Sequence, residues 1–153
     1  MKKLLKLTSL LLIVALILNV AACASSYGKI QKALEDAGYS VVEEMESLTD
    51  STKEKLEKEA DEKLALEIHV FKKIDGFSSA LVLVLEFSAT EDLVEYVKGS
   101  ETAQGFIKDV ASDEDVNAFY NTLVEEGYAN GNCLVFAISL TETDNVKELV
   151  KNA

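Results

Sequence analysis

The chain has 153 residues, which allows one domain and a short appendage. It carries 15 lysines, no arginine and 27 acidic residues, for a formal net charge of −12 at pH 7. This anionic balance disfavours nucleic-acid binding, and the missing arginines disfavour bidentate recognition of phosphate groups. Three lysines and no acidic residue precede residue 23, so the part of the chain that begins there has a net charge of −15.

The first 22 residues have the three parts of an export signal. A lysine-rich start at 1–6 precedes an apolar run at 7–18 and then a group of small residues. The apolar run is short for a membrane-spanning helix, which needs about 20 apolar residues. The residue that follows the small group, Cys23, is one of only two cysteines in the chain.

A branched apolar residue and two small ones, Val20, Ala21 and Ala22, stand directly before Cys23. This motif resembles the lipobox of bacterial lipoproteins. The resemblance implies that the Cys23 thiol receives a diacylglyceryl group and that a peptidase recognising the motif removes residues 1–22. It also implies palmitate-type acylation and a domain on the extracytoplasmic side of the cell membrane. The alternative is an uncleaved anchor in which Cys23 has no role.

After the signal, residues 23–28 are predicted to be the lipidated cysteine and a tether, and 29–153 a single domain. Apolar residues at helical spacing predict a first helix that ends at Gly38, a natural left-handed stop. A tether this short holds the helix close to the bilayer. We therefore expect Lys29 and Lys32 on this helix to face the lipid headgroups.

A β-hairpin is predicted from alternating apolar residues at 64–70 and an apolar strand at 80–87. Asp75 and Gly76 are predicted to form the tight turn between the two strands. The second strand is apolar on both alternating faces, with leucines and Phe87 on one face and smaller residues on the other. This pattern predicts a central strand that is covered on both sides.

Shorter patterns complete the order of elements. They are a weak strand at 40–45, a surface helix at 51–63, helices at 90–99 and 116–127, a strand at 130–140 and a helix at 143–151. This order matches an α+β fold of the ferredoxin-like split β-α-β type, with a mostly antiparallel four-stranded sheet and extra N- and C-terminal helices. One sheet face would be bare, so the terminal helices or a second subunit would have to cover Ala80, Val82 and Val84.

Residues that could carry chemistry are few. His69 is the only histidine, and it is the one weak candidate for a catalytic residue, although no partner for it is evident in the sequence. Cys133 has no partner for a disulfide if Cys23 is lipidated, and it is predicted to be a packed apolar residue at a strand start. The acidic stretch 113–117 lacks the glycine and glutamate of a calcium loop, so it is predicted to begin a helix instead.

These observations predict a membrane-anchored, non-catalytic binding or accessory module with no metal and no cofactor. Its expected partners are the bilayer, through acylated Cys23, and another protein or a second copy, through a sheet face. The alternative is a small extracytoplasmic enzyme of the hydrolase type that uses His69 and nearby acids. A structural envelope protein without a discrete ligand is the third hypothesis.

Overall fold

The computed structural model describes residues 25–42, 54, 58, 66–76, 78–107, 110 and 115–153. The signal segment, Cys23 and most of the predicted helix at 51–63 lie outside these residues; Glu54 and Lys58 of that helix are described and are helical. None of the helices in the described part of the chain is long and apolar enough to cross a membrane.

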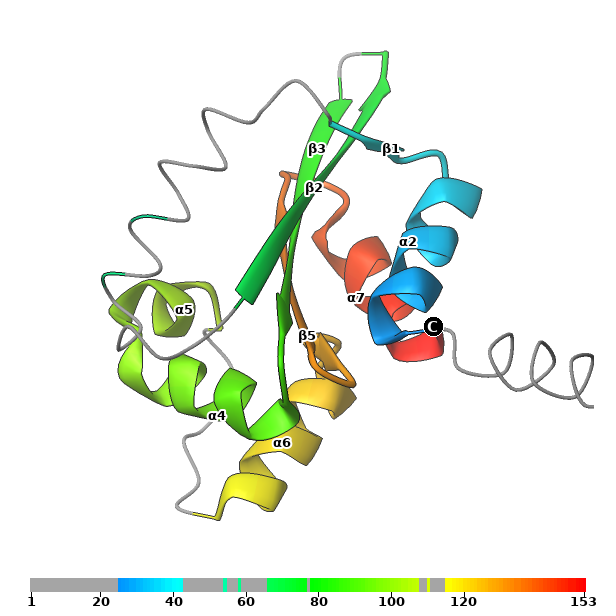
Figure 1. The fold of residues 1–153 in the computed structure, drawn as a ribbon. Helices are drawn as coiled ribbons and strands as arrows, with labels where there is room; N and C mark the ends of the chain where they lie inside the picture. The colour runs from blue at the N-terminus through cyan, green and yellow to red at the C-terminus, as the bar shows by residue number, and fades with distance from the viewer. Residues whose placement is uncertain are drawn as a thin grey trace, which may run out of the picture.

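The strands form one antiparallel sheet in the order β1-β2-β3-β5-β4 (Figure 1). Their bounds are Ser40–Val41 for β1, Leu66–Asp75 for β2, Ser78–Phe87 for β3, Ala129–Asn130 for β4 and Cys133–Ile138 for β5. The doubly apolar strand β3 lies third of the five and pairs with β2 on one side and β5 on the other. The prediction that it is a central strand is confirmed.

The α+β class and the antiparallel sheet are confirmed, but the ferredoxin-like split arrangement is not, and the sheet has five strands where four were predicted. A split β-α-β unit places its two strands parallel, whereas β1 runs antiparallel to β2 and pairs with it directly. The added strand β4 is only two residues long and forms a hairpin with β5. Two residues are too few to show an alternating pattern in a sequence.

Three helices cover one face of the sheet (Figure 1). They are α4 at Thr90–Gly99, α5 at Glu101–Phe106 and α6 at Val116–Glu125. Their buried apolar residues pack with alternate residues of the strands in one cluster, which includes Leu85, Phe87 and Leu134. Most of the described aromatic residues in this layer, such as Tyr96, are almost completely buried.

The other face is covered by the terminal helices, α2 at Ser26–Asp36 and α7 at Thr143–Asn152. Ile30 and Leu34 of α2 and Val146 and Val150 of α7 form one buried cluster with strand residues that include Ala80, Val82 and Val84. The terminal helices therefore cover these three residues, which was one of the two predicted solutions. The sheet face that was expected to receive a partner is consequently closed by the chain itself.

The first helix begins at Ser26, three residues before the predicted domain start. Ser25 is its N-cap, and the Ser25 hydroxyl accepts a hydrogen bond from the Gly28 N–H at 3.1 Å. This cap satisfies one of the unpaired N–H groups of the first turn. The helix stops before Gly38, whose φ of +88° lies in the left-handed region, as the sequence predicts.

Candidate functional site

The β2–β3 hairpin brings Glu67, His69 and Glu86 together. Glu67 pairs with Glu86 across the ladder, and His69 lies two residues further along β2 on the same face. Asp75 pairs with Ser78, so Asp75 still belongs to strand β2 and the turn begins at Gly76, one residue later than predicted. Gly76 allows this turn because its φ is +58°, which a residue with a side chain rarely adopts.

The three side chains converge on one small volume. His69 Nε2 lies 3.3 Å from Glu86 Oε2 and 4.0 Å from Glu67 Oε2. One ligand atom from each of the three residues lies within 4.8 Å of the other two. The His69 and Glu86 side chains are 21% and 22% exposed, whereas Glu67 is 78% exposed. The cluster is therefore half-buried and opens to solvent on the side of Glu67.

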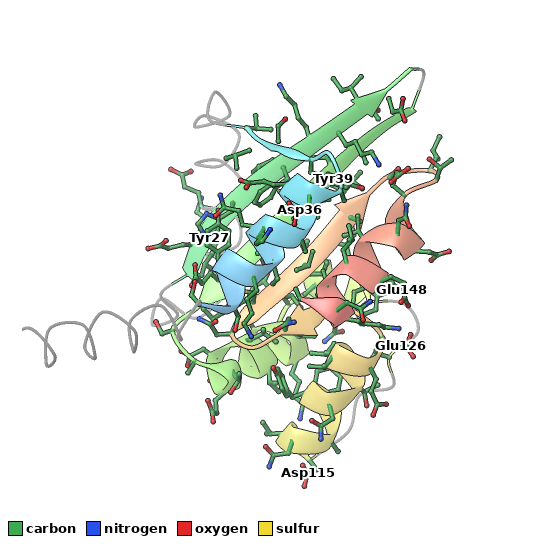
Figure 2. The ribbon with its side chains drawn as sticks, turned by 90° about the vertical axis from the view of Figure 1, so that its right-hand side faces the viewer. Tyr27, Asp36, Tyr39, Asp115, Glu126 and Glu148 are labelled. Atoms are coloured by element: carbon green, nitrogen blue, oxygen red, sulfur yellow. The ribbon has the colours of Figure 1, made fainter. Side chains whose placement is uncertain are left out.

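Tyr27 covers the imidazole of His69 from the first turn of α2. The two rings are stacked, with centroids 3.7 Å apart and planes at 18°. Figure 2 shows Tyr27 and Asp36 at opposite ends of α2, so the cluster lies at the end of the helix that follows Cys23 in the sequence. Tyr27 also lies 6.5 Å, centroid to centroid, from buried Phe71. This stacking fixes the plane of the imidazole.

The cluster concentrates negative charge. Glu67 and Glu86 stand directly opposite each other across two strands, an arrangement that destabilises a sheet when both residues carry the same charge. Among the described residues, no lysine forms an ion pair with either carboxylate. Burial, and then the charge of Glu86, raise the pKa of the Tyr27 hydroxyl. In the described part of the chain, the one group within ion-pair distance of these carboxylates is therefore the His69 imidazole that lies between them.

Cys133 lies beside this cluster, paired with Glu86 across β3 and β5. It opens β5 and is completely buried, which agrees with the prediction of a packed residue at a strand start. Burial and the charge of Glu86 raise the pKa of the Cys133 thiol to about 12. Because the thiolate is the reactive form, this cysteine is unsuited to nucleophilic chemistry.

We expect Cys133 to resist alkylation in the folded protein. With a pKa of about 12, about one thiol in 10⁴ is ionised at a pH near 8, and the sulfur is also shielded from solvent. The measurement is the rate of modification by iodoacetamide in a Cys23→Ala variant, before and after unfolding in urea. Equal rates in the two states would show that the thiol is accessible.

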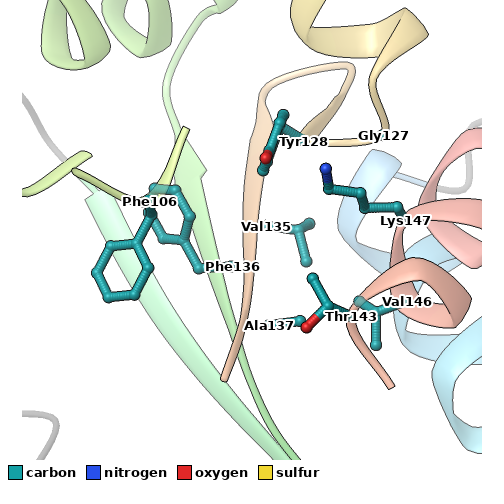
Figure 3. A pocket seen from close by; sticks show the side chains of 9 residues that line it. All are labelled: Phe106, Gly127, Tyr128, Val135, Phe136, Ala137, Thr143, Val146 and Lys147. Atoms are coloured by element: carbon teal, nitrogen blue, oxygen red, sulfur yellow. The ribbon is translucent and has the colours of Figure 1, made fainter. Parts of the chain in front are cut away.

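A small cavity lies between β5 and α7, near the core (Figure 3). Its lining includes Phe106, Tyr128, Val135 and Lys147, and the Lys147 ammonium lies 4.1 Å from the centroid of the Tyr128 ring. Its volume of about 40 Å³ admits a water molecule, but ligand pockets are typically about 300–1,000 Å³. This cavity is therefore too small for an organic ligand.

Other residues singled out in the sequence have structural roles or lie outside the described part. Asp115, in the acidic stretch, is the N-cap of α6, and its carboxylate accepts hydrogen bonds from the Asn117 and Ala118 N–H groups. The lipobox residues and Cys23 are not among the described residues. His69 is thus the one described candidate that gains partners, and the sequence reasoning did not identify Glu86 as one of them.

No protein-family model, curated protein or solved structure matches this chain, so its function has to be argued from its own residues.

Proposed function

We propose that the chain is a bacterial lipoprotein: an extracytoplasmic α+β module that acylated Cys23 anchors to the cell membrane and that binds a ligand without transforming it. The observation that carries the proposal is the motif Val20-Ala21-Ala22-Cys23 behind a basic and then an apolar segment. Two or three acyl chains, at about 0.8 kcal/mol per buried CH₂, give a lasting anchor.

The short connection between Cys23 and the domain supports a position close to the bilayer. Only residues 24 and 25 separate the cysteine from the first residue of α2. At about 3.3–3.6 Å per residue, the three residues from Cys23 to Ser26 span about 11 Å at most. Lys29 and Lys32 are both exposed on α2, in agreement with a helix whose basic residues contact headgroups. The Glu67–His69–Glu86 cluster would then lie near the membrane surface.

The composition of the cluster favours binding over catalysis. No described serine, threonine or cysteine is hydrogen-bonded to His69, and Cys133 is buried with a raised pKa. A mechanism with a serine, threonine or cysteine nucleophile needs that hydroxyl or thiol within hydrogen-bond reach of the base. The two carboxylates and the imidazole form a set of ligand atoms instead.

The second candidate is a small hydrolase-like enzyme that uses His69 with the nearby acids. The contact between His69 and Glu86 favours it, because a carboxylate can orient an imidazole as a general base. The test is a His69→Ala strain compared with a deletion strain of the same protein. If His69→Ala restores every phenotype that the parent restores, the enzymatic hypothesis is wrong.

The anchor is tested by growing the producing bacterium with a radiolabelled fatty acid. The parent and a Cys133→Ala control should incorporate label into the protein, and a Cys23→Ala variant should not, because only Cys23 would be acylated. The two cysteines make this a matched pair. Label in the Cys23→Ala variant equal to that in the parent would contradict the proposal.

A further inference from the structure

The distances within the Glu67–His69–Glu86 cluster are close to those of a metal site. Nitrogen and oxygen ligands lie about 2.0–2.2 Å from Zn²⁺, so in a tetrahedral arrangement two ligand atoms are about 3.3–3.6 Å apart. His69 Nε2 and Glu86 Oε2 are 3.3 Å apart, which falls in this range. Glu67 Oε2 is 4.0 Å from the same nitrogen, and its side chain is exposed, so a small rotation would complete the set.

The surroundings of the cluster suit a bound cation. The stacked ring of Tyr27 holds the imidazole in its plane, so the imidazole is already oriented before an ion binds. The two opposed carboxylates repel each other without a cation, and a divalent ion would turn that repulsion into two attractive contacts. The open side at Glu67 gives the ion a path from solvent and leaves a position for water.

From these observations we infer that Glu67, His69 and Glu86 bind one divalent transition-metal ion, with Zn²⁺ as the representative, through His69 Nε2 and one oxygen of each carboxylate. The imidazole ligand favours Zn²⁺ over Ca²⁺ and Mg²⁺, which prefer oxygen ligands alone. This inference rests on the proposed binding role and names its ligand class. It revises the sequence-based expectation of no metal site, which rested on the chain having a single histidine and, after lipidation of Cys23, a single free cysteine.

The test is a titration of the full chain in detergent with Zn²⁺, followed by calorimetry and by competition with a chromophoric chelator. We expect one Zn²⁺ per chain in the parent. His69→Ala and Glu86→Gln should each weaken binding by about 100-fold or more, since even loss of an outer-shell partner costs about 10- to 100-fold. Glu125→Gln, which removes an exposed acid on α6, should leave the affinity unchanged.

Three results would overturn the inference. The first is equal Zn²⁺ affinity in His69→Ala and the parent. The second is binding of several ions of equal affinity, which would indicate the general negative surface. The third is Ca²⁺ or Mg²⁺ binding as tight as that of Zn²⁺. If His69→Ala does not fold, Glu67→Gln serves in its place, because Glu67 is 78% exposed and its substitution leaves the core intact.

The outcome of this titration is separable from that of the anchor test. A chain that incorporates fatty acid at Cys23 but does not bind Zn²⁺ contradicts the metal site alone. A chain that binds Zn²⁺ through His69 but is not acylated contradicts the anchor alone. Both measurements can be made on protein purified from the labelled cells, so that differences in preparation do not affect the comparison.

Discussion

Truncation of Phe71 to alanine is expected to lower the free energy of unfolding by about 3–5 kcal/mol. Phe71 is completely buried and belongs to the cluster between the sheet and the terminal helices α2 and α7. Its removal leaves a cavity beneath α2 that the surrounding residues can fill only in part. Because Tyr27 contacts both Phe71 and His69, the same substitution should also weaken the stacking of Tyr27 on the His69 imidazole.

The measurement for Phe71→Ala is unfolding in urea followed by circular dichroism. Lys72→Ala is the matched control, because Lys72 is the next residue of β2 and points to solvent. Its replacement should change the stability by less than about 0.5 kcal/mol. If Phe71→Ala were no more destabilising than Lys72→Ala, the terminal helices α2 and α7 would not be packed on the sheet as described.

The replacement of Gly127 by alanine should cost about 2–5 kcal/mol. Gly127 follows α6 with φ of +76°, and a side chain in this left-handed region costs about 1–2 kcal/mol. A Cβ atom there would also lie 2.6 Å from the backbone oxygen of Lys147 in α7. The backbone of α7 would have to move, and overpacking of this kind adds about 1–3 kcal/mol.

The variant Gly38→Ala separates the cost of the left-handed backbone from the cost of the clash with α7. Gly38 follows the end of α2 and has a φ of +88°, which is left-handed like that of Gly127. A Cβ atom at Gly38, however, would have no neighbour within 4 Å. We therefore expect a loss of only about 1–2 kcal/mol, from the backbone conformation alone. Both variants can be compared by thermal and urea unfolding. Equal losses at the two glycines would mean that α6 and α7 do not approach as closely as described.

The part of the fold that the sequence predicts is the part with strong local patterns. The two apolar faces of β3 led directly to a central strand covered on both sides, and Gly38 marked the end of α2. The topology was not predictable in this way, because β1 and β4 each have only two residues. Their places in the sheet depend on contacts between distant segments, which leave no period in the sequence.

The candidate site was only half predictable for a related reason. Glu67 lies two residues before His69 in β2, so strand alternation alone puts the two on the same face. Glu86 lies beside them only because of the way β2 and β3 are paired in the hairpin. The predicted turn at Asp75 and Gly76 would place Glu67 opposite Val84, two residues along β3 from its observed partner Glu86. Glu86 would then be a diagonal neighbour, farther from the other two side chains. Nothing in the sequence indicated that Tyr27 would stack on His69, because that contact joins segments about forty residues apart.

These proposals give the chain a consistent arrangement: a lipid at Cys23, a connection of a few residues, and a ligand cluster beneath the first turn of α2. The proposed anchor and the cluster both lie near the start of α2, since Tyr27, which stacks on His69, follows Cys23 by four residues. At about 3.3–3.6 Å per residue, a lipid on Cys23 would keep His69 within reach of the headgroup region. A metal bound there would be held at the membrane surface.

The central claim is that the mature chain begins with a lipidated Cys23, and mass spectrometry of the N-terminal peptide tests it most directly. The peptide is released by proteolysis from protein isolated from the membrane fraction of the producing bacterium. We predict that it begins at Cys23 and carries the mass of a diacylglyceryl group on the sulfur. A peptide that begins at Met1, or one that contains an unmodified Cys23, would contradict the proposal.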